Sequence, residues 1–141
     1  MKAKILIGGQ ALRNLGSDRY TDDVDYLIND LSTKDAFICS EKVDYLNANG
    51  NDFFSEIFNI ESGNKQASAQ SLLDLKCYAF VQHCQNFNFA KADSCEYDIK
   101  FLVRNFNISP KIVKKYISLG ELSEIEKIII NIKKSITQFK N

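Results

Sequence analysis

The stretch Ile-Gly-Gly-Gln-Ala-Leu-Arg-Asn-Leu-Gly-Ser-Asp-Arg-Tyr-Thr-Asp-Asp-Val-Asp, residues 7 to 25, decides how this sequence is interpreted. A glycine pair, Gly8 and Gly9, ends a short apolar run, and an Asp-x-Asp pair, Asp23 and Asp25, follows 13 residues later. Glycines let backbone amides approach a phosphate chain closely, and two carboxylates on one strand face can chelate the Mg²⁺ that phosphates carry. The alternative is that the aspartates cap turns and keep a strand edge soluble.

The first half of the chain is predicted to form a small sheet. Alternating or continuous apolar patterns indicate four short strands, and glycine or asparagine clusters separate them. Period-two geometry places Asp23 and Asp25 on one face of the second strand. The segment 53–60 fits a strand or a helix equally well. The predicted strands cover residues 3–7, 23–28, 36–39 and 42–47, with a short helix over 10–15.

The second half is predicted to be helical. Ser68 or Ser71 can cap a long helix that reaches about residue 85, and Ser109-Pro110 is expected to open another. Further helices are predicted over 94–105 and 121–139. The expected fold is therefore α+β: a small mixed sheet over 1–65, followed by a helical bundle over 66–141 that packs on it as one compact unit.

Composition limits the class of protein. The chain has 141 residues, 45% of them hydrophobic, 26% charged and one proline, which is ordinary for a globular protein. The net charge is zero, but residues 1–65 are acidic and residues 99–141 are basic. An acidic half suits metal binding, while the basic tail suits either a solvated helix face or a polyanion. Four cysteines without a Cys-x-x-Cys pair, no signal peptide and no membrane-length apolar run predict a cytoplasmic protein.

These motifs resemble the nucleotidyltransferase superfold typified by DNA polymerase β, and within it the bacterial minimal and abortive-infection (AbiEii-like) nucleotidyltransferases. That family combines a hydrophobic-Gly-Gly/Ser element, an Asp-x-Asp pair on the next strand and a third acidic residue on a later strand. Ile7-Gly8-Gly9 matches the first element. The run from Arg19 to Asp25 resembles the Arg-aromatic-Ser/Thr-x-Asp-hydrophobic-Asp run of the abortive-infection branch.

The resemblance requires a third carboxylate. Asp44 is the best candidate because it lies between apolar neighbours on a predicted strand, and Glu56 is the alternative. Only 18 residues separate Asp25 from Asp44, which leaves no room for the helix that often precedes this strand in the family. The sheet is therefore abbreviated here, or Asp44 is an ordinary strand residue.

Two residues of the second half are also candidates. Lys76, in Leu72-Leu-Asp-Leu-Lys76-Cys-Tyr-Ala79, resembles the Leu-x-x-Lys-x-x-Ala helix of the same branch. Helical periodicity places Lys76 within the apolar arc, where it can neutralise a buried carboxylate of the sheet, bind a phosphate or extend to the surface. His83 is the single imidazole and is expected to be half-buried and structural.

The last predicted helix carries an apolar stripe. Its members recur at spacings of three and four, which favours burial in the core and leaves a homodimer through this helix as the alternative. The basic residues beside the stripe are interpreted as its solvated face. The stripe contains Leu122, Ile125, Ile129, Ile132, Ile136 and Phe139, and the basic residues are Lys127, Lys133, Lys134 and Lys140.

The resemblance implies a nucleotidyltransferase that moves a nucleoside monophosphate from a nucleoside triphosphate to a hydroxyl of RNA or protein, in phage defence or a toxin–antitoxin pair. It implies Mg²⁺, with Mn²⁺ as an alternative, held by Asp23, Asp25 and Asp44. The triphosphate would contact four further residues: Gly8, Gly9, Arg19 and Lys76. The rival hypothesis is a catalytically inactive module of the same fold that binds nucleotide or a protein partner.

Overall fold

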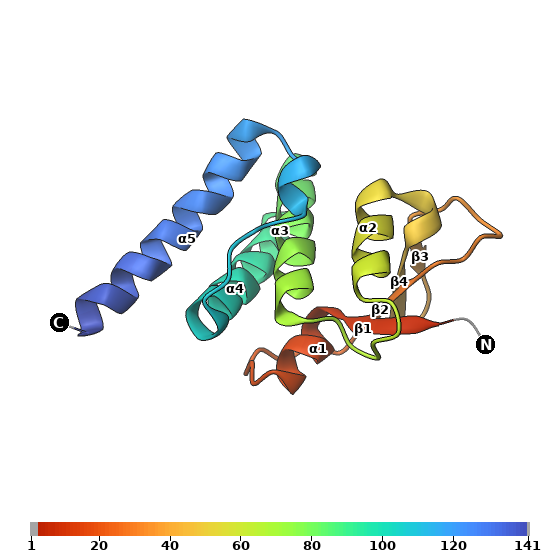
Figure 1. The fold of residues 1–141 in the computed structure, drawn as a ribbon, viewed down its shortest axis with the longest axis horizontal. Coiled ribbons are helices and arrows are strands. Elements are labelled where there is room, and N and C mark those ends of the chain that lie inside the picture. Colours follow the sequence, from red (N-terminus) through yellow and green to blue (C-terminus); the bar gives the residue numbers. More distant parts are fainter. Residues whose placement is uncertain (1–2, 141) are drawn as a thin grey trace. The chain divides into compact units, whose positions relative to one another are not determined.

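The computed structural model describes residues 3–140, with side chains described through residue 136. The protein is α+β, and the chain divides into two compact units, Met1–Leu72 and Leu73–Asn141, with the boundary inside helix α3. The elements, shown in Figure 1, run in the order β1 Lys4–Ile7, α1 Gly8–Asn14, β2 Val24–Ile28, β3 Phe37–Cys39, β4 Val43–Asn47, η1 Ala48–Gly50, α2 Asp52–Ile60, α3 Ala69–Gln85, α4 Phe89–Phe106, η2 Val113–Lys115 and α5 Leu119–Lys140.

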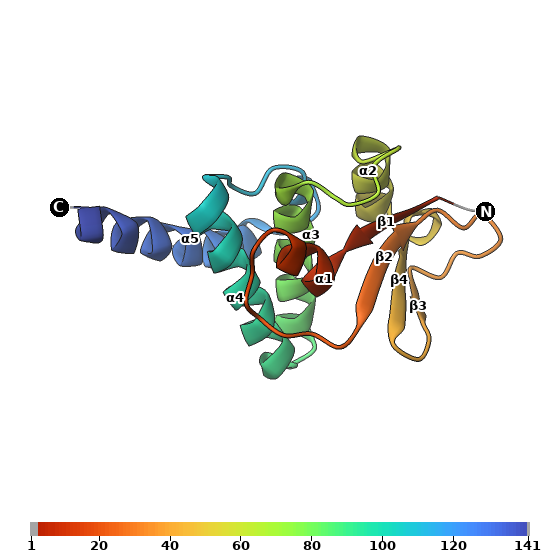
Figure 2. The same ribbon diagram turned by 90° about the horizontal axis from the view of Figure 1, so that it is seen from below.

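The first unit is built on a mixed four-stranded sheet with the order β1-β2-β4-β3. Strands β1 and β2 are antiparallel, β2 and β4 are parallel, and β4 and β3 are antiparallel. The four predicted strands are confirmed to within one residue at either end. Figure 2 shows α1 continuing directly from the end of β1.

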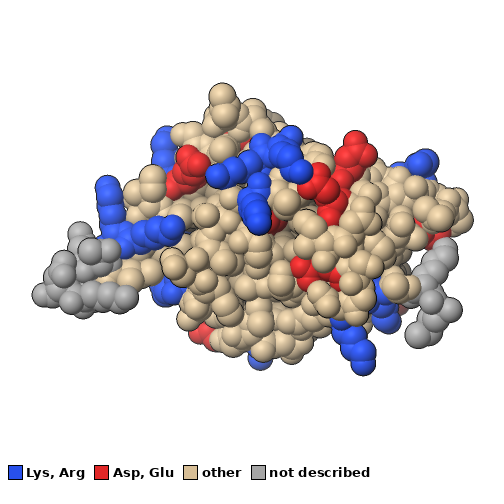
Figure 3. Space-filling model, viewed as in Figure 1, with Lys and Arg blue, Asp and Glu red and all other residues tan. Residues whose placement is uncertain are grey.

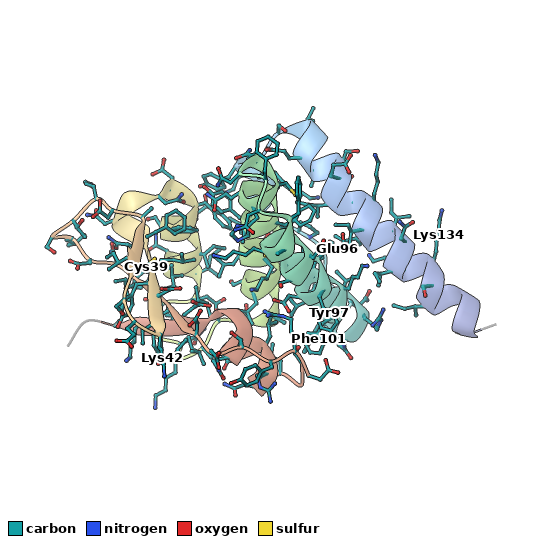
Figure 4. The ribbon with its side chains drawn as sticks, turned by 180° about the vertical axis from the view of Figure 1, so that it is seen from behind. Cys39, Lys42, Glu96, Tyr97, Phe101 and Lys134 are labelled. Carbon is teal, nitrogen blue, oxygen red and sulfur yellow. The ribbon has the colours of Figure 1, made fainter. Side chains whose placement is uncertain are left out.

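The short connection between Asp25 and Asp44 is explained by the position of β3. Parallel neighbours need a crossover, for which a helix is the usual solution. Here β3 carries the chain back, a tight turn follows, and β4 enters the sheet between β2 and β3. Cys39 and Lys42, on either side of that turn, are labelled in Figure 4. Lys42 has a positive φ of 68°, which helps the chain to reverse direction there. The connection between β2 and β4 contains no helix, in agreement with the short separation of Asp25 and Asp44.

Asn47, at the end of β4, fixes the loop that makes this crossover possible. Its side chain is fully buried, and its amide nitrogen lies 3.3, 3.3 and 3.1 Å from the carbonyl oxygens of Asp30, Thr33 and Asp35. Its amide oxygen accepts a hydrogen bond from the Asp30 N–H at 2.8 Å. One side chain thereby satisfies several backbone groups of the loop between β2 and β3, which pair with no strand.

One face of the sheet is covered by α2. The sequence of residues 53–60 fits a strand or a helix equally well, and the structure shows a helix there. Asn51 caps this helix by accepting a hydrogen bond from the Phe54 N–H at 3.0 Å. Phe53, Phe54 and Ile57 are buried at helical spacing, and Phe54 packs edge-to-face on Phe37 of β3 at a centroid distance of 5.6 Å. Together with Leu27 of β2 they form the core of this unit.

The second unit is helical. Helix α4 starts five residues earlier than predicted because Asn88 caps it, and Ser68, one of the two predicted caps, begins α3. The predicted helix at Ser109-Pro110 is wrong. The chain there forms only the short turn η2, because the buried Asp74 carboxylate accepts hydrogen bonds from the N–H groups of Lys111 and Val113.

Helix α5 packs against α4 through the predicted stripe. Ile125, Ile129 and Ile132 are at most 7% exposed, so this part of the stripe belongs to the core of the unit. The side chains of Phe139 and Lys140 lie outside the described part. Figure 3 shows acidic and basic side chains together on one face of the molecule. Among the described residues, no helix combines the length and the apolar character needed to cross a membrane.

Candidate functional site

The glycine pair lies where β1 passes into α1, and each glycine is in close contact with the acidic segment. Gly8 has a φ of +70°, and a Cβ at this position would lie 2.2 Å from the Asp25 Oδ2 atom. A Cβ at Gly9 would lie 2.5 Å from the Thr21 methyl carbon. Both distances are shorter than real Cβ contacts, so glycine is required at both positions for β2 and the loop before it to approach this closely.

The two aspartates on the central strands are direct neighbours. Asp25 on β2 and Asp44 on β4 are register partners in the parallel pair, and Ile7 of β1 is the antiparallel partner of Asp25. Adjacent strands lie about 4.8 Å apart, and register partners point to the same face. Both aspartates are half-buried, on the face that also carries the buried Leu27. Asp44 therefore lies beside Asp25.

Asp23 has a different environment. It precedes β2 by one residue and is exposed, so the predicted strand start at Asp23 is one residue early. No group of three or more His, Cys, Asp or Glu residues placed to hold a metal ion occurs among the residues that the structure describes. Two predicted metal ligands therefore lie side by side, and the third lies at the entrance to the strand.

The other predicted residues of the first unit are placed as follows. Glu56, the alternative third carboxylate, lies on helix α2 rather than on a strand. Arg19 is half-buried in the loop between α1 and β2, where its carbonyl oxygen accepts a hydrogen bond from Arg13 Nη1 at 3.3 Å. Its own N–H donates to Ser17 Oγ at 3.3 Å. Both hydrogen bonds hold the backbone of Arg19 in place within the loop.

Gln10 and Thr21 were missed by the sequence interpretation. The Gln10 side-chain amide donates a hydrogen bond to the Thr21 carbonyl oxygen at 3.1 Å, which fastens the acidic loop to α1. The exposed Tyr20 hydroxyl donates to Asp22 Oδ1 in the same loop, and this bond raises the pKa of Tyr20. The sequence signal for the contact between Gln10 and Thr21 was the polar Gln10 itself, which lies between the apolar residues Ile7 and Ala11.

Lys76 and His83 belong to the helical unit. The Lys76 ammonium lies 3.1 Å from Asp98 Oδ2, with side-chain exposures of 17% and 0%. The predicted buried carboxylate partner is therefore present, but it belongs to α4 and not to the sheet. Burial lowers the pKa of His83, and the nearby charges of Lys91 and Lys76 lower it further, so the imidazole is disfavoured in its charged form.

Comparisons of the chain with protein-family models, with curated proteins and with solved structures find no match.

Proposed function

We propose that this protein is a Mg²⁺-dependent nucleotidyltransferase that transfers a nucleoside monophosphate from a nucleoside triphosphate to a hydroxyl of RNA or protein. The observation that carries the proposal is the pairing of Asp25 with Asp44 on adjacent parallel strands, directly beside Gly8. Asp25 and Asp44, 19 positions apart, lie side by side, and Asp25 approaches Gly8 so closely that only glycine fits there. A solvated acidic strand edge would not require such a fit.

The donor set fits magnesium. Mg²⁺ prefers oxygen ligands and is usually held by one or two carboxylates together with the substrate's phosphate oxygens and water. Asp25 and Asp44 supply two carboxylates, and the exposed Asp23 can supply another when a triphosphate is present. Bound Mg²⁺, or Mn²⁺ in its place, would neutralise charge on the triphosphate during transfer.

The chain's own residues have distinct roles in this proposal. Gly8 and Gly9 let Asp25 and the loop before it lie close against the start of α1, and Arg19 offers a cation on that loop. The acceptor oxygen forms a bond to the α-phosphorus, the bond from this phosphorus to the pyrophosphate oxygen breaks, and Asp44 accepts the acceptor's proton. Lys76 is assigned a structural role, since a phosphate role would require its ion pair with Asp98 to open.

The test is a transfer assay. The protein is incubated with each labelled nucleoside triphosphate, Mg²⁺, and either bulk transfer RNA or cell lysate. We expect labelling by the natural sequence and at least ~100-fold less by Asp25→Asn and Asp44→Asn, since each removes a ligand. Asp52→Asn, an exposed carboxylate on α2, is the matched control and should retain full activity.

Equal labelling by all four proteins, or none by any, would overturn the enzymatic proposal. Mg²⁺-dependent triphosphate binding without transfer would instead favour the inactive nucleotide-binding module.

The biological setting is proposed on weaker grounds. All four cysteines are described, and none of them is in a disulfide, which fits a reducing cytoplasm. A role in phage defence or a toxin–antitoxin pair rests on the sequence resemblance and is tested by co-purification with a protein encoded beside it.

A further inference from the structure

The sheet has a second face, which the helices of its own unit leave open. Helix α2 covers the face that carries Leu27, since Phe54 packs on Phe37 there. The start of α1 lies on that same side, since Gly8 lies against Asp25. Side chains alternate along a strand, so the remaining positions point to the opposite face. The apolar side chains of this open face are all half-buried, and they are Leu6, Val24, Tyr26, Ile28, Ile38, Val43 and Tyr45.

Two tyrosines lie at the centre of the open face. Tyr26 of β2 and Tyr45 of β4 are register partners on the two central strands, and their rings are nearly parallel, with an angle of 23° and centroids 6.1 Å apart. The Lys4 ammonium of β1 lies 4.4 Å from the centroid of the Tyr26 ring. Tyr26 therefore presents the face of its ring to a cation, and the side chain that occupies this position is exposed and flexible.

Charge is segregated between the two faces. The four strands are fully described, and they carry two carboxylates, Asp25 and Asp44, both on the covered face. The charged side chain of the open face is Lys4, whose position on β1 alternates with that of Ile5. Aromatic rings beside a cation, on a face without carboxylates, are complementary to a ligand that combines planar bases with negative phosphates.

The size of the open face argues against a second copy of the chain as its occupant. Four strands spaced about 4.8 Å apart give a face about 19 Å wide and, over four to five residues, about 15 Å long. Two such faces packed together would bury roughly 600–900 Å² in total, which is less than the ~1,200 Å² of a specific dimer. A four-stranded sheet of this size has room for two or three stacked bases.

We propose that the open face binds single-stranded RNA, with one base stacked on Tyr26, a second on Tyr45, and a phosphate beside Lys4. The Lys4 ammonium moves from the Tyr26 ring to the phosphate when the base arrives. The choice of RNA rests on the proposed function, in which RNA is an acceptor, because single-stranded DNA offers the same rings and phosphates. Binding itself uses neither triphosphate nor Mg²⁺.

The first test measures the fluorescence anisotropy of a labelled ten-nucleotide RNA of mixed sequence, without triphosphate and with a chelator. Tyr26→Leu and Tyr45→Leu should each weaken binding at least ~5-fold, because each removes one stacked base, whereas Tyr26→Phe keeps the ring and should bind as the natural sequence does. Leucine keeps the face apolar, and thermal denaturation checks that each variant folds. Tyr97→Leu is the matched control: this tyrosine of α4, labelled in Figure 4, is 47% exposed, and its loss should leave binding unchanged.

The second test concerns Lys4. Lys4→Gln should weaken RNA binding about 3-fold and reduce the dependence of log K on log salt by about 0.7, the value for one phosphate contact on a single strand. Lys127→Gln, at an exposed position of α5, should change neither quantity.

The third test needs no variant. RNA that contains 5-iodouridine is cross-linked to the natural sequence by light, and the modified peptide is identified by mass spectrometry. Cross-links at Tyr26 or Tyr45 are expected, and cross-links confined to other residues would overturn the proposal.

Three further results would overturn it: no binding of RNA, binding of equal strength in the double variant Tyr26→Leu/Tyr45→Leu, or tighter binding of DNA of the same sequence. A dimer that Tyr26→Arg dissociates would place a second copy on the face and would also overturn it. Because these assays contain no triphosphate, their failure leaves transfer to a protein hydroxyl intact, and failure of the transfer assay leaves RNA binding intact.

Discussion

The carboxylates of the two units differ in how their charge is used. In the helical unit, Asp74 and Asp98 are fully buried, and each is held by groups from elsewhere in that unit: Asp74 by two backbone N–H groups and Asp98 by Lys76. In the sheet unit, Asp25 and Asp44 are half-buried and placed beside each other, charge against like charge. Like-charged neighbours on adjacent strands destabilise a sheet.

In our proposal, this difference reflects a structural role for Asp74 and Asp98 and metal binding by Asp25 and Asp44. A buried carboxylate with its partners supplied by the fold is part of the folding energetics. Two half-buried carboxylates in register are the ligands that our proposal assigns to Mg²⁺. The predictions below test this separation, from the largest expected loss of stability to the smallest.

Lys76→Met should give the largest loss, about 3–5 kcal/mol in the free energy of unfolding, because it leaves the buried Asp98 charge without its cation. Chemical denaturation measures the loss. The double variant Lys76→Met/Asp98→Leu should recover most of it. Lys100→Met is the matched control, since its pair with Glu96 is at the surface and should contribute less than about 0.5 kcal/mol.

Asp74→Ala should cost about 2–4 kcal/mol, because the N–H groups of Lys111 and Val113 lose their acceptor. Asp93→Ala, at an exposed position of α4, serves as the control and should be close to neutral. If the two variants unfold at the same denaturant concentration, the η2 turn is not held by Asp74.

Gly8→Ala should cost roughly 2–3 kcal/mol, because its Cβ would meet the Asp25 carboxylate and because its φ is positive. Gly63→Ala has the same kind of backbone, with φ +89°, but no neighbour within 4 Å, so it should cost only about 1 kcal/mol. Thermal and chemical denaturation measure the stability loss of both variants. The difference between the two losses separates the effect of the close contact with Asp25 from the effect of backbone strain. Equal losses would show that Gly8 does not contact Asp25 as described.

Glu61 provides a pH test within the sheet unit. Burial alone would raise its pKa, but hydrogen bonds from Ser71, Ser68 and Asn64 outweigh burial and hold the pKa below the ordinary value. The stability it contributes, about 1–2 kcal/mol, is therefore present above the unfolded-state pKa near 4.5 and is lost as pH falls through the lower folded-state pKa. Urea unfolding between pH 7 and pH 3 should show that loss, and Glu61→Gln should reduce the slope. An unchanged slope would contradict the assignment.

Asp44→Asn should have the smallest effect on stability, within about 0.5 kcal/mol of the natural sequence and in the stabilising direction, because it removes a like-charge neighbour of Asp25. Thermal denaturation in the absence of divalent ions measures it. A loss as large as that of Asp74→Ala would place Asp44 among the structural carboxylates and contradict the separation.

The sequence predicted the sheet well because its signals are local. Period-two patterns located β2 and β4, and the glycine pair located the end of β1. The α4 start and the η2 turn were missed for the opposite reason. Asn88 caps α4 from outside the apolar pattern, and Asp74 acts on residues 37 and 39 positions later, a distance that no local pattern reveals.

The candidate site was predictable as a set of residues but not as an arrangement. The residue pattern supplied Gly8, Asp25 and Asp44, whereas their contact depends on β4 entering the sheet between β2 and β3. The partner of Lys76 could be predicted in kind, as a buried carboxylate, but only the packing of α3 on α4 selects Asp98 over the acidic residues of the sheet.

The central claim is that Asp25 and Asp44 together bind a Mg²⁺–triphosphate complex, and isothermal titration calorimetry tests it most directly. Each nucleoside triphosphate is titrated into the protein with Mg²⁺ and again with excess chelator. The account predicts Mg²⁺-dependent binding that Asp44→Asn weakens at least ~10-fold and Asp52→Asn leaves unchanged. Binding of equal strength in Asp44→Asn, or no binding of any triphosphate to the natural sequence, would contradict it.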